Sequence, residues 1–297
     1  MALQLRGYVA LPPHRAGGFD HGDVHHDSGR VFVAHTAFGT VDVIDADRLQ
    51  SVDTVPGCPE GSGVLCTDDT VFAAARGAAK VLLLDPQSLV VRSEIGVGPK
   101  PNGLAWDPDR RQLLVADVED NRARLLDPTT GETLAKTLLP GRPRWCVFDR
   151  ARDRFLVNIR EPACVVSLAG GPAESVARID VSAAGPHGLD LDAGADRAFV
   201  ACDAASLIVL DLSRNQELAR VPIGGEPDAI WFNAQRNLVY VAIGKPGMID
   251  VVDCRRNDVA ERVTTEEGAH TTAFDAVHQR LYVFLPGTSR TAVYEEV

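Results

Sequence analysis

Histidine side chains gather near the start of the chain. The stretch GGFDHGDVHHDSGRVFVAH, residues 17–35, holds four of the eight histidines, and His14 lies just before it. Imidazole is a frequent ligand of transition metals and exchanges its proton near neutral pH, so these residues suit either metal binding or proton transfer. Both kinds of chemistry require the fold to point the rings at one place, so the elements that carry them must be identified first.

Composition and charge limit the classes of function. The 297 residues include 45% hydrophobic ones, and we treat residues 1–297 as a single domain with a substantial core. The net charge of −11 disfavours nucleic acid and anionic membranes as partners, because both require a basic surface. The N-terminal apolar run is too short and interrupted for a signal peptide, and no long apolar stretch follows, so we expect a cytoplasmic protein. Six cysteines without a C-x-x-C pair are interpreted as small buried hydrophobic residues of a reducing compartment.

A sequence motif repeats along the chain about every 42 residues. PNGLAWDPDRRQLLVAD and PHGLDLDAGADRAFVAC are two of five clear copies, each with a polar residue, a short apolar strand, an Asp-containing turn and a second strand. The polar residues that open these copies are spaced by 42, 43, 41 and 42 residues: Asn102, Arg144, His187, Asp228 and His270. Two further copies lie upstream, ending in VFVAH and TVFAAAR. A third strand and a more polar fourth segment follow, which is the pattern of a propeller blade.

The repeats therefore predict an all-β, seven-bladed β-propeller with four antiparallel strands per blade. The last copy lacks its fourth strand, whereas residues 4–11 form an unassigned strand before the first blade. A ring of blades leaves an open edge unless one blade is completed by both termini. We therefore expect the N-terminal strand to complete blade seven. A propeller closed in this way needs no partner chain, so a monomer is the default expectation.

One face of such a ring would collect the polar residues that open the inner strands. In the repeat frame these are His21, Ser62, Asn102, Arg144, His187, Asp228 and His270. Blade one is ambiguous between His21 and Gly22, and blade two between Glu60 and Ser62, because a shift of one residue reverses the direction of the side chains. The loops between second and third strands add further polar residues to the same face: His35, Arg76, Asp117, Glu119, Arg160, Glu161, Cys202, Asp203 and Lys245.

Histidines from different blades are the candidate metal ligands. The predicted set is His21, His35, His187 and His270, completed by Asp203 or Asp228, around a divalent ion such as Fe, Cu, Mn, Zn or Mg. The open alternative is a solvated polar funnel that holds no metal. His14 and His278 are expected at the surface. Neither a phosphate-binding loop nor a G-x-S-x-G motif is present, so no nucleotide cofactor is expected.

Two classes of function follow from this face. The first is an enzyme acting on a small molecule, with an anionic substrate as one option and with His187, His270 and Arg144 as catalytic candidates. Its candidate substrate-binding residues are Asn102, Arg160, Asp228 and Lys245, where Arg and Lys would hold a carboxylate. The second class is a non-catalytic propeller that binds a small ligand or a protein partner on the same face. Trp106, Trp145 and Trp231 lie on inner strands and are expected to fill space between blades.

The repeats resemble those of the YVTN β-propeller family, as in LVYVAIGKPGMIDVVD and EIGVGPKPNGLAWDPD. The P-H-G phrase at His187, and less closely at His270 where Ala269 replaces proline, also resembles virginiamycin B lyase. That resemblance, together with the lactonase propellers, implies a divalent cation and a lyase or lactone-opening reaction with His187 or His270 as general base. Gly268 departs from the acidic residue that the lyase carries just before its last histidine. A histidine-ligated iron or copper site of the oxygenase type is therefore a further alternative.

Overall fold

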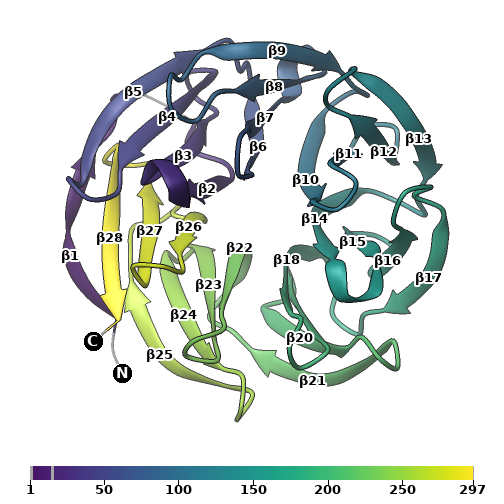
Figure 1. Ribbon diagram of the computed structural model, residues 1–297. Helices are drawn as coiled ribbons and strands as arrows, with labels where there is room; N and C mark the ends of the chain where they lie inside the picture. The colour runs from purple at the N-terminus through teal and green to yellow at the C-terminus, as the bar shows by residue number, and fades with distance from the viewer. Residues whose placement is uncertain (1–2, 15–16, 297) are drawn as a thin grey trace.

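Seven four-stranded antiparallel sheets surround a central axis in the computed structural model, which describes residues 3–14 and 17–296 (Figure 1). In each sheet the strands follow one another in sequence order from the axis outward, except that the outer strand of the last sheet comes from the N-terminus. The predicted seven-bladed propeller is confirmed.

Blades one to four follow each other around the ring. Blade one consists of β2 (Gly22–His25), β3 (Arg30–His35), β4 (Thr40–Asp45) and β5 (Gln50–Pro56). Blade two consists of β6 (Gly61–Cys66), β7 (Val71–Ala75), β8 (Lys80–Leu84) and β9 (Val91–Gly96). Blade three consists of β10 (Pro101–Asp107), β11 (Gln112–Asp117), β12 (Arg122–Asp127) and β13 (Glu132–Leu138). Blade four consists of β14 (Pro143–Asp149), β15 (Arg154–Ile159), β16 (Cys164–Ala169) and β17 (Ser175–Asp180).

The remaining blades return to the start of the chain. Blade five consists of β18 (Pro186–Asp192), β19 (Arg197–Cys202), β20 (Ser206–Asp211) and β21 (Gln216–Pro222). Blade six consists of β22 (Glu226–Asn233), β23 (Leu238–Lys245), β24 (Met248–Asp253) and β25 (Asp258–Thr264). Blade seven consists of β26 (Thr271–Asp275), β27 (Arg280–Leu285), β28 (Arg290–Glu296) and β1 (Leu3–Ala10). Three single-turn 3-10 helices, η1 (His26–Ser28), η2 (Arg76–Ala78) and η3 (Arg150–Arg152), occupy turns.

The burial of each strand follows its place in the blade. Second and third strands are buried on both faces because each blade is covered by its two neighbours, and they read as continuous apolar runs such as VFAAA in β7. Outer strands alternate between exposed and half-buried residues, as in β13 and β25. Five blades place a fully buried aromatic side chain at the same position of the second strand: Phe32, Phe72, Phe199, Tyr240 and Tyr282.

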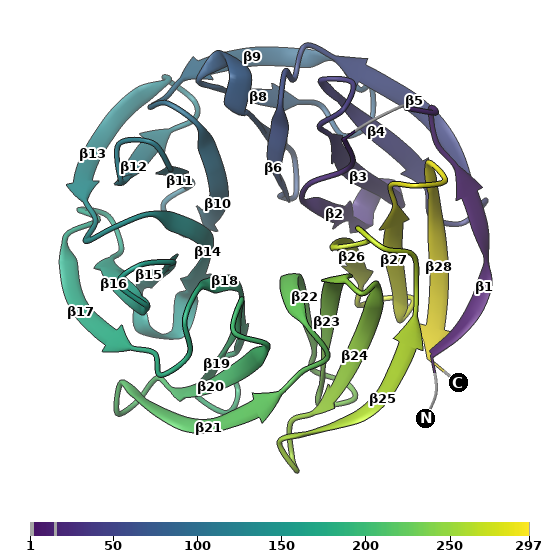
Figure 2. The ribbon, with the colours of Figure 1, turned by 180° about the vertical axis from the view of Figure 1, so that it is seen from behind.

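The N-terminal strand closes the ring. β1 pairs antiparallel with β28, from Leu3 opposite Glu296 to Ala10 opposite Arg290. Figure 2 shows β1 along the outer edge of blade seven, beside β28. The expected strand over residues 4–11 is thus confirmed with a shift of one residue. Within the described ranges, no helix has the length and apolar character needed to cross a membrane.

Candidate functional site

The inner strands share one register, which identifies the residue that each blade presents at its top end. Leu104 pairs with Val115, Leu189 with Val200 and Ile230 with Val241, and the polar residue lies two positions before each first partner. In blade two Val64 pairs with Ala73, so Ser62 occupies this position and the alternative Glu60 does not. These equivalent positions therefore form one ring around the top of the channel.

The register corrects the prediction for blade one. Gly22 pairs with Val33, the equivalent of Val115, so the ring position belongs to Asp20. Neither His21 nor Gly22 occupies it. His21 takes the next position, and its ring stacks on the indole of Trp145 in blade four, with centroids 3.9 Å apart. The buried ring of His21 therefore lies between the top face and the channel below it.

His187 is the most highly connected side chain of the top face. Its Nδ1 lies 3.1 Å from Asp203 Oδ1, which fits an N–H donated to the carboxylate. Its Nε2 accepts a hydrogen bond from the Arg144 guanidinium and lies 3.1 Å from Asp228 Oδ1. The contact with Arg144 requires the lone pair of Nε2 and so a neutral ring with its proton on Nδ1, whereas the contact with Asp228 suits a protonated Nε2, so the surroundings of His187 accommodate both the neutral and the charged ring.

The two carboxylates beside His187 are held in their ionised form. Burial raises the pKa of Asp203, but the hydrogen bond from His187 and the charges of His187, Arg160 and Arg144 outweigh it, and the pKa is lowered. Burial likewise opposes ionisation of Asp228, yet the charges of His187, His270, Arg144 and His21 lower its pKa. Positive charge around both groups therefore keeps them available to orient and stabilise an imidazolium.

These side chains line a polar pocket of about 290 Å³ between blades four and seven. Arg160, in the loop after β15, forms a 2.6 Å ion pair with Asp203. His270 is partly exposed, with Nε2 3.7 Å from Asp228 Oδ2, and Lys245 is exposed at the rim. The structure thus brings together seven residues of the predicted face and adds Glu226: Arg144, Arg160, His187, Asp203, Asp228, Lys245 and His270.

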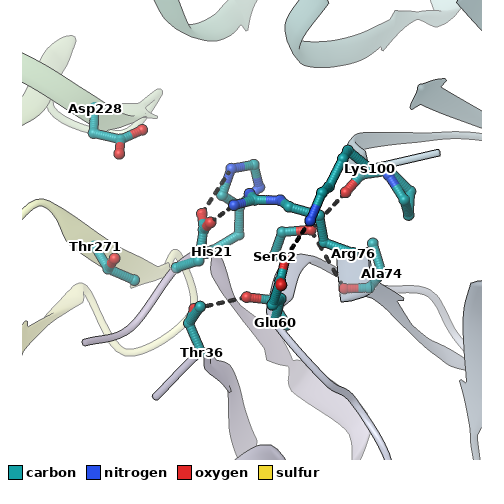
Figure 3. A network of polar contacts seen from close by, with 12 residues as sticks. His21, Thr36, Glu60, Ser62, Ala74, Arg76, Lys100, Asp228 and Thr271 are labelled. Atoms are coloured by element: carbon teal, nitrogen blue, oxygen red, sulfur yellow. Dashed lines mark hydrogen bonds and ion pairs between the residues drawn. The ribbon is translucent and has the colours of Figure 1, made fainter. Parts of the chain in front are cut away.

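The other side of the top face is committed to structural contacts (Figure 3). The Asp20 carboxylate binds Arg76 at 2.9 Å and lies 3.4 Å from His21 Nε2. Ser62 Oγ donates to the Pro101 carbonyl at 2.8 Å and so ties blade two to blade three. Asn102, predicted to bind substrate, is buried and does not line the pocket around His187.

His35 is separated from the other predicted metal ligands. Its fully buried ring lies 2.7 Å from Asp42 through Nδ1 and 2.8 Å from His14 Nδ1 through Nε2. Both ring nitrogens are therefore used inside blade one. His14, expected at the surface, is half-buried and belongs to this chain of hydrogen bonds, whereas His278 is exposed as expected and pairs with Asp275.

The five predicted metal ligands His21, His35, His187, His270 and Asp203 are thus not brought to one point. Across the described parts of the chain, no group of three or more His, Cys, Asp or Glu side chains is arranged to hold a metal ion. At His187 the Arg144 guanidinium already places a positive charge against Nε2. These donors do not fit a resident metal ion in this arrangement.

A second cavity, of about 210 Å³, lies among the inner strands below the His21–Trp145 stack. Its wall is mostly apolar and includes all three tryptophans, which the sequence analysis had placed between blades. It also includes Asp23 and Asp190, which the sequence analysis missed. The available signal was an acidic residue inside an inner strand, where the other copies carry apolar residues.

Comparisons with known proteins agree with the fold. No family model matches the chain. The uncharacterized protein YncE of Salmonella typhimurium strain LT2 is 21% identical over 244 residues, which cover 81% of this chain and only 58% of that protein. The hydrazine synthase of Kuenenia stuttgartiensis superposes with a TM-score of 0.87 at 13% identity, covering 96% of this chain and 97% of the other. Identities this low show the propeller architecture alone.

Proposed function

We propose that the pocket around His187 is the active site of an enzyme that moves a proton on a small carboxylate-bearing substrate. The observation that carries the proposal is the placement of His187 between Asp203 and Asp228 with Arg144 against its Nε2. A histidine held by a carboxylate at one nitrogen, with its other nitrogen facing a pocket, is a recurring device for general acid–base catalysis.

The cations of the pocket supply the substrate-binding part of the proposal. A substrate carboxylate would be drawn to Arg144, Arg160 and Lys245, of which guanidinium groups can bind both oxygens at once. Movement of Arg144 toward that carboxylate would release the Nε2 lone pair of His187. His187 Nε2 then accepts a proton, either from the substrate carbon next to a carbonyl group or from the water molecule that attacks the carbonyl of a lactone. Asp203 and Asp228 stabilise the resulting imidazolium.

This reaction class is the one implied by the resemblance to virginiamycin B lyase and the lactonase propellers. A lyase and a lactone-opening hydrolase share the same first requirement, a base beside a polarised carbonyl. The divalent ion implied by that resemblance stays a prediction, and no step above depends on it. His270, looser and more exposed than His187, is assigned the donation of a proton to the leaving group: it begins the cycle protonated beside Asp228, and exchange with water afterwards restores its proton and removes the one taken by His187.

Turnover of a panel of lactones and hydroxy acids by purified protein tests the proposal. His187→Gln keeps the side-chain volume but removes the base, and we expect kcat to fall by a factor on the order of 10² to 10⁴. Arg160→Met is expected to raise KM more than it changes kcat, because it removes charge at the substrate carboxylate. His278→Gln, on the opposite face, is the matched control and should behave as wild type.

Other outcomes separate the alternatives. Turnover unchanged in His187→Gln refutes the proposed base. A panel compound that binds without conversion, with only its affinity altered in His187→Gln, identifies a non-catalytic binding propeller. Elemental analysis of untagged protein tests the metal prediction, because near-stoichiometric metal that is lost in His187→Gln would assign the site to metal chemistry.

A further inference from the structure

The cavity beneath the top face carries two acids in an otherwise apolar wall. It is bounded above by the stacked rings of His21 and Trp145, and Asp23 and Asp190 line it from blades one and five. Both carboxyl groups line this one cavity, and the charge of Asp190 adds to the burial that raises the pKa of Asp23. Two acids facing one apolar space disfavour each other's ionisation unless a positive group joins them.

Each acid also touches the next blade. Asp23 Oδ2 accepts the backbone N–H of Cys66 at 2.7 Å, and Asp190 Oδ2 accepts that of Phe232 at 2.6 Å. Each carboxylate also accepts a hydrogen bond from the backbone N–H of the residue that follows it in the chain. A carboxylate has about four lone-pair sites, so these two bonds use only part of its hydrogen-bonding capacity. The remaining capacity can serve a ligand in the cavity.

Joining blades does not require an acid at this position. The register places apolar residues at the equivalent site of the other five blades: Leu65, Ala105, Val147, Trp231 and Ala273. Four of those blades pack against their neighbours without a side-chain hydrogen bond from this position, and in blade six the indole of Trp231 donates one instead of accepting it. Contact between neighbouring blades therefore does not by itself explain why Asp23 and Asp190 are acidic.

An aromatic wall lies between the two acids. Trp231, in blade six, donates Nε1–H to the Thr272 carbonyl of blade seven at 3.1 Å. Its indole therefore reaches from blade six to blade seven, the two blades that lie between blade five and blade one in the ring. Trp106, Trp145 and Phe148 also belong to the aromatic part of the lining, and the three indole rings are partly exposed. An alkylammonium ion is attracted to the face of an aromatic ring, most strongly to that of tryptophan, and nearby carboxylates add to the attraction.

We propose that the channel cavity between Asp23, Asp190 and Trp231 binds a small organic cation of the alkylammonium class. The cavity volume of about 210 Å³ suits a compact ammonium head group. Aromatic rings and few free oxygens favour an organic cation over a hard metal ion, which takes six or more oxygen ligands when it is calcium. This site is separate from the pocket around His187 and does not depend on its chemistry.

Titration with choline and with 3,3-dimethyl-1-butanol, its neutral carbon isostere, tests the proposal. Isothermal titration calorimetry and tryptophan fluorescence, both at neutral pH, provide the readouts. We expect saturable choline binding that changes the fluorescence, and binding of the alcohol weaker by a factor on the order of ten or more. Equal binding of the two compounds, or saturable binding of neither, overturns the proposal.

Variants locate the site. Asp190→Asn and Asp23→Asn remove the charge and keep one acceptor oxygen, which can bind the backbone N–H of the next blade, while the second accepted bond is lost. Each should weaken choline binding on the order of tenfold while the thermal unfolding transition persists. Asp258→Asn removes the same charge from an exposed outer-strand position and is the matched control. Wild-type choline affinity in both channel variants refutes the assignment, whereas loss of turnover without loss of choline binding concerns the His187 pocket alone.

Discussion

At the scale of single residues, Asp23 shows how the channel wall alters acid strength. Burial is the main cause that raises the pKa of this carboxyl group to about 7, and the charge of Asp190 adds to it, against hydrogen bonds from Cys66 and Val24. In the unfolded chain the pKa is near its ordinary value of 3.8. The folded protein therefore binds more protons than the unfolded chain between these values, so raising the pH through this interval lowers the free energy of unfolding.

Asp23→Asn should remove this cost. At about pH 8 we expect the variant to exceed wild type by roughly 1–3 kcal/mol in the free energy of unfolding, and at about pH 3.5 to differ little, because below 3.8 Asp23 is neutral in both the folded protein and the unfolded chain. Urea unfolding at both pH values measures the difference, with exposed Asp258→Asn as the control. A stability difference that is the same at both pH values would contradict the assigned cause.

At the scale of elements, the second strands hold the blades together. Val241 of β23 is fully buried in the cluster between blades five and six. Val241→Asp places an unpaired charge there and should cost on the order of 4 kcal/mol or more, enough to unfold a marginally stable chain. Leu218→Asp on outer strand β21, where the side chain is 46% exposed, should leave the melting temperature nearly unchanged. Similar melting curves for the two variants would contradict the packing described for β23.

The strands were predictable from sequence, whereas several side-chain directions were not. Repeat spacing and apolar runs determine blade number and strand positions, because every blade buries the same faces. In blade one, polar residues surround the strand start, so the hydrophobic pattern could not distinguish Asp20 from His21 or Gly22. His35 points inward because it bonds to Asp42 and His14, a pairing that depends on the folded path of the chain.

At the scale of the whole molecule, ring closure depends on one strand from the far end of the chain. β1 pairs with β28 and also contacts β5 of blade one, so it joins the last blade to the first. Val9 contributes its buried side chain to the core between these blades, whereas Leu5 is 45% exposed. Without β1, the hydrogen-bonding groups along one edge of β28 would lose their partners.

A chain that lacks the β1 segment should therefore unfold at a lower temperature and associate through the exposed edge of β28. A synthetic peptide of residues 3–11, added in excess, should raise the melting temperature again, because binding to the folded state alone stabilises it. A peptide of the same composition in scrambled order is the control, and sedimentation velocity follows the association. If the shortened chain melts as the full chain does, or if both peptides act alike, closure by β1 contributes little to the stability of the ring. Rescue by the native order alone would show that blade seven is completed by specific pairing, since only that order places Val9 inside and Leu5 outside.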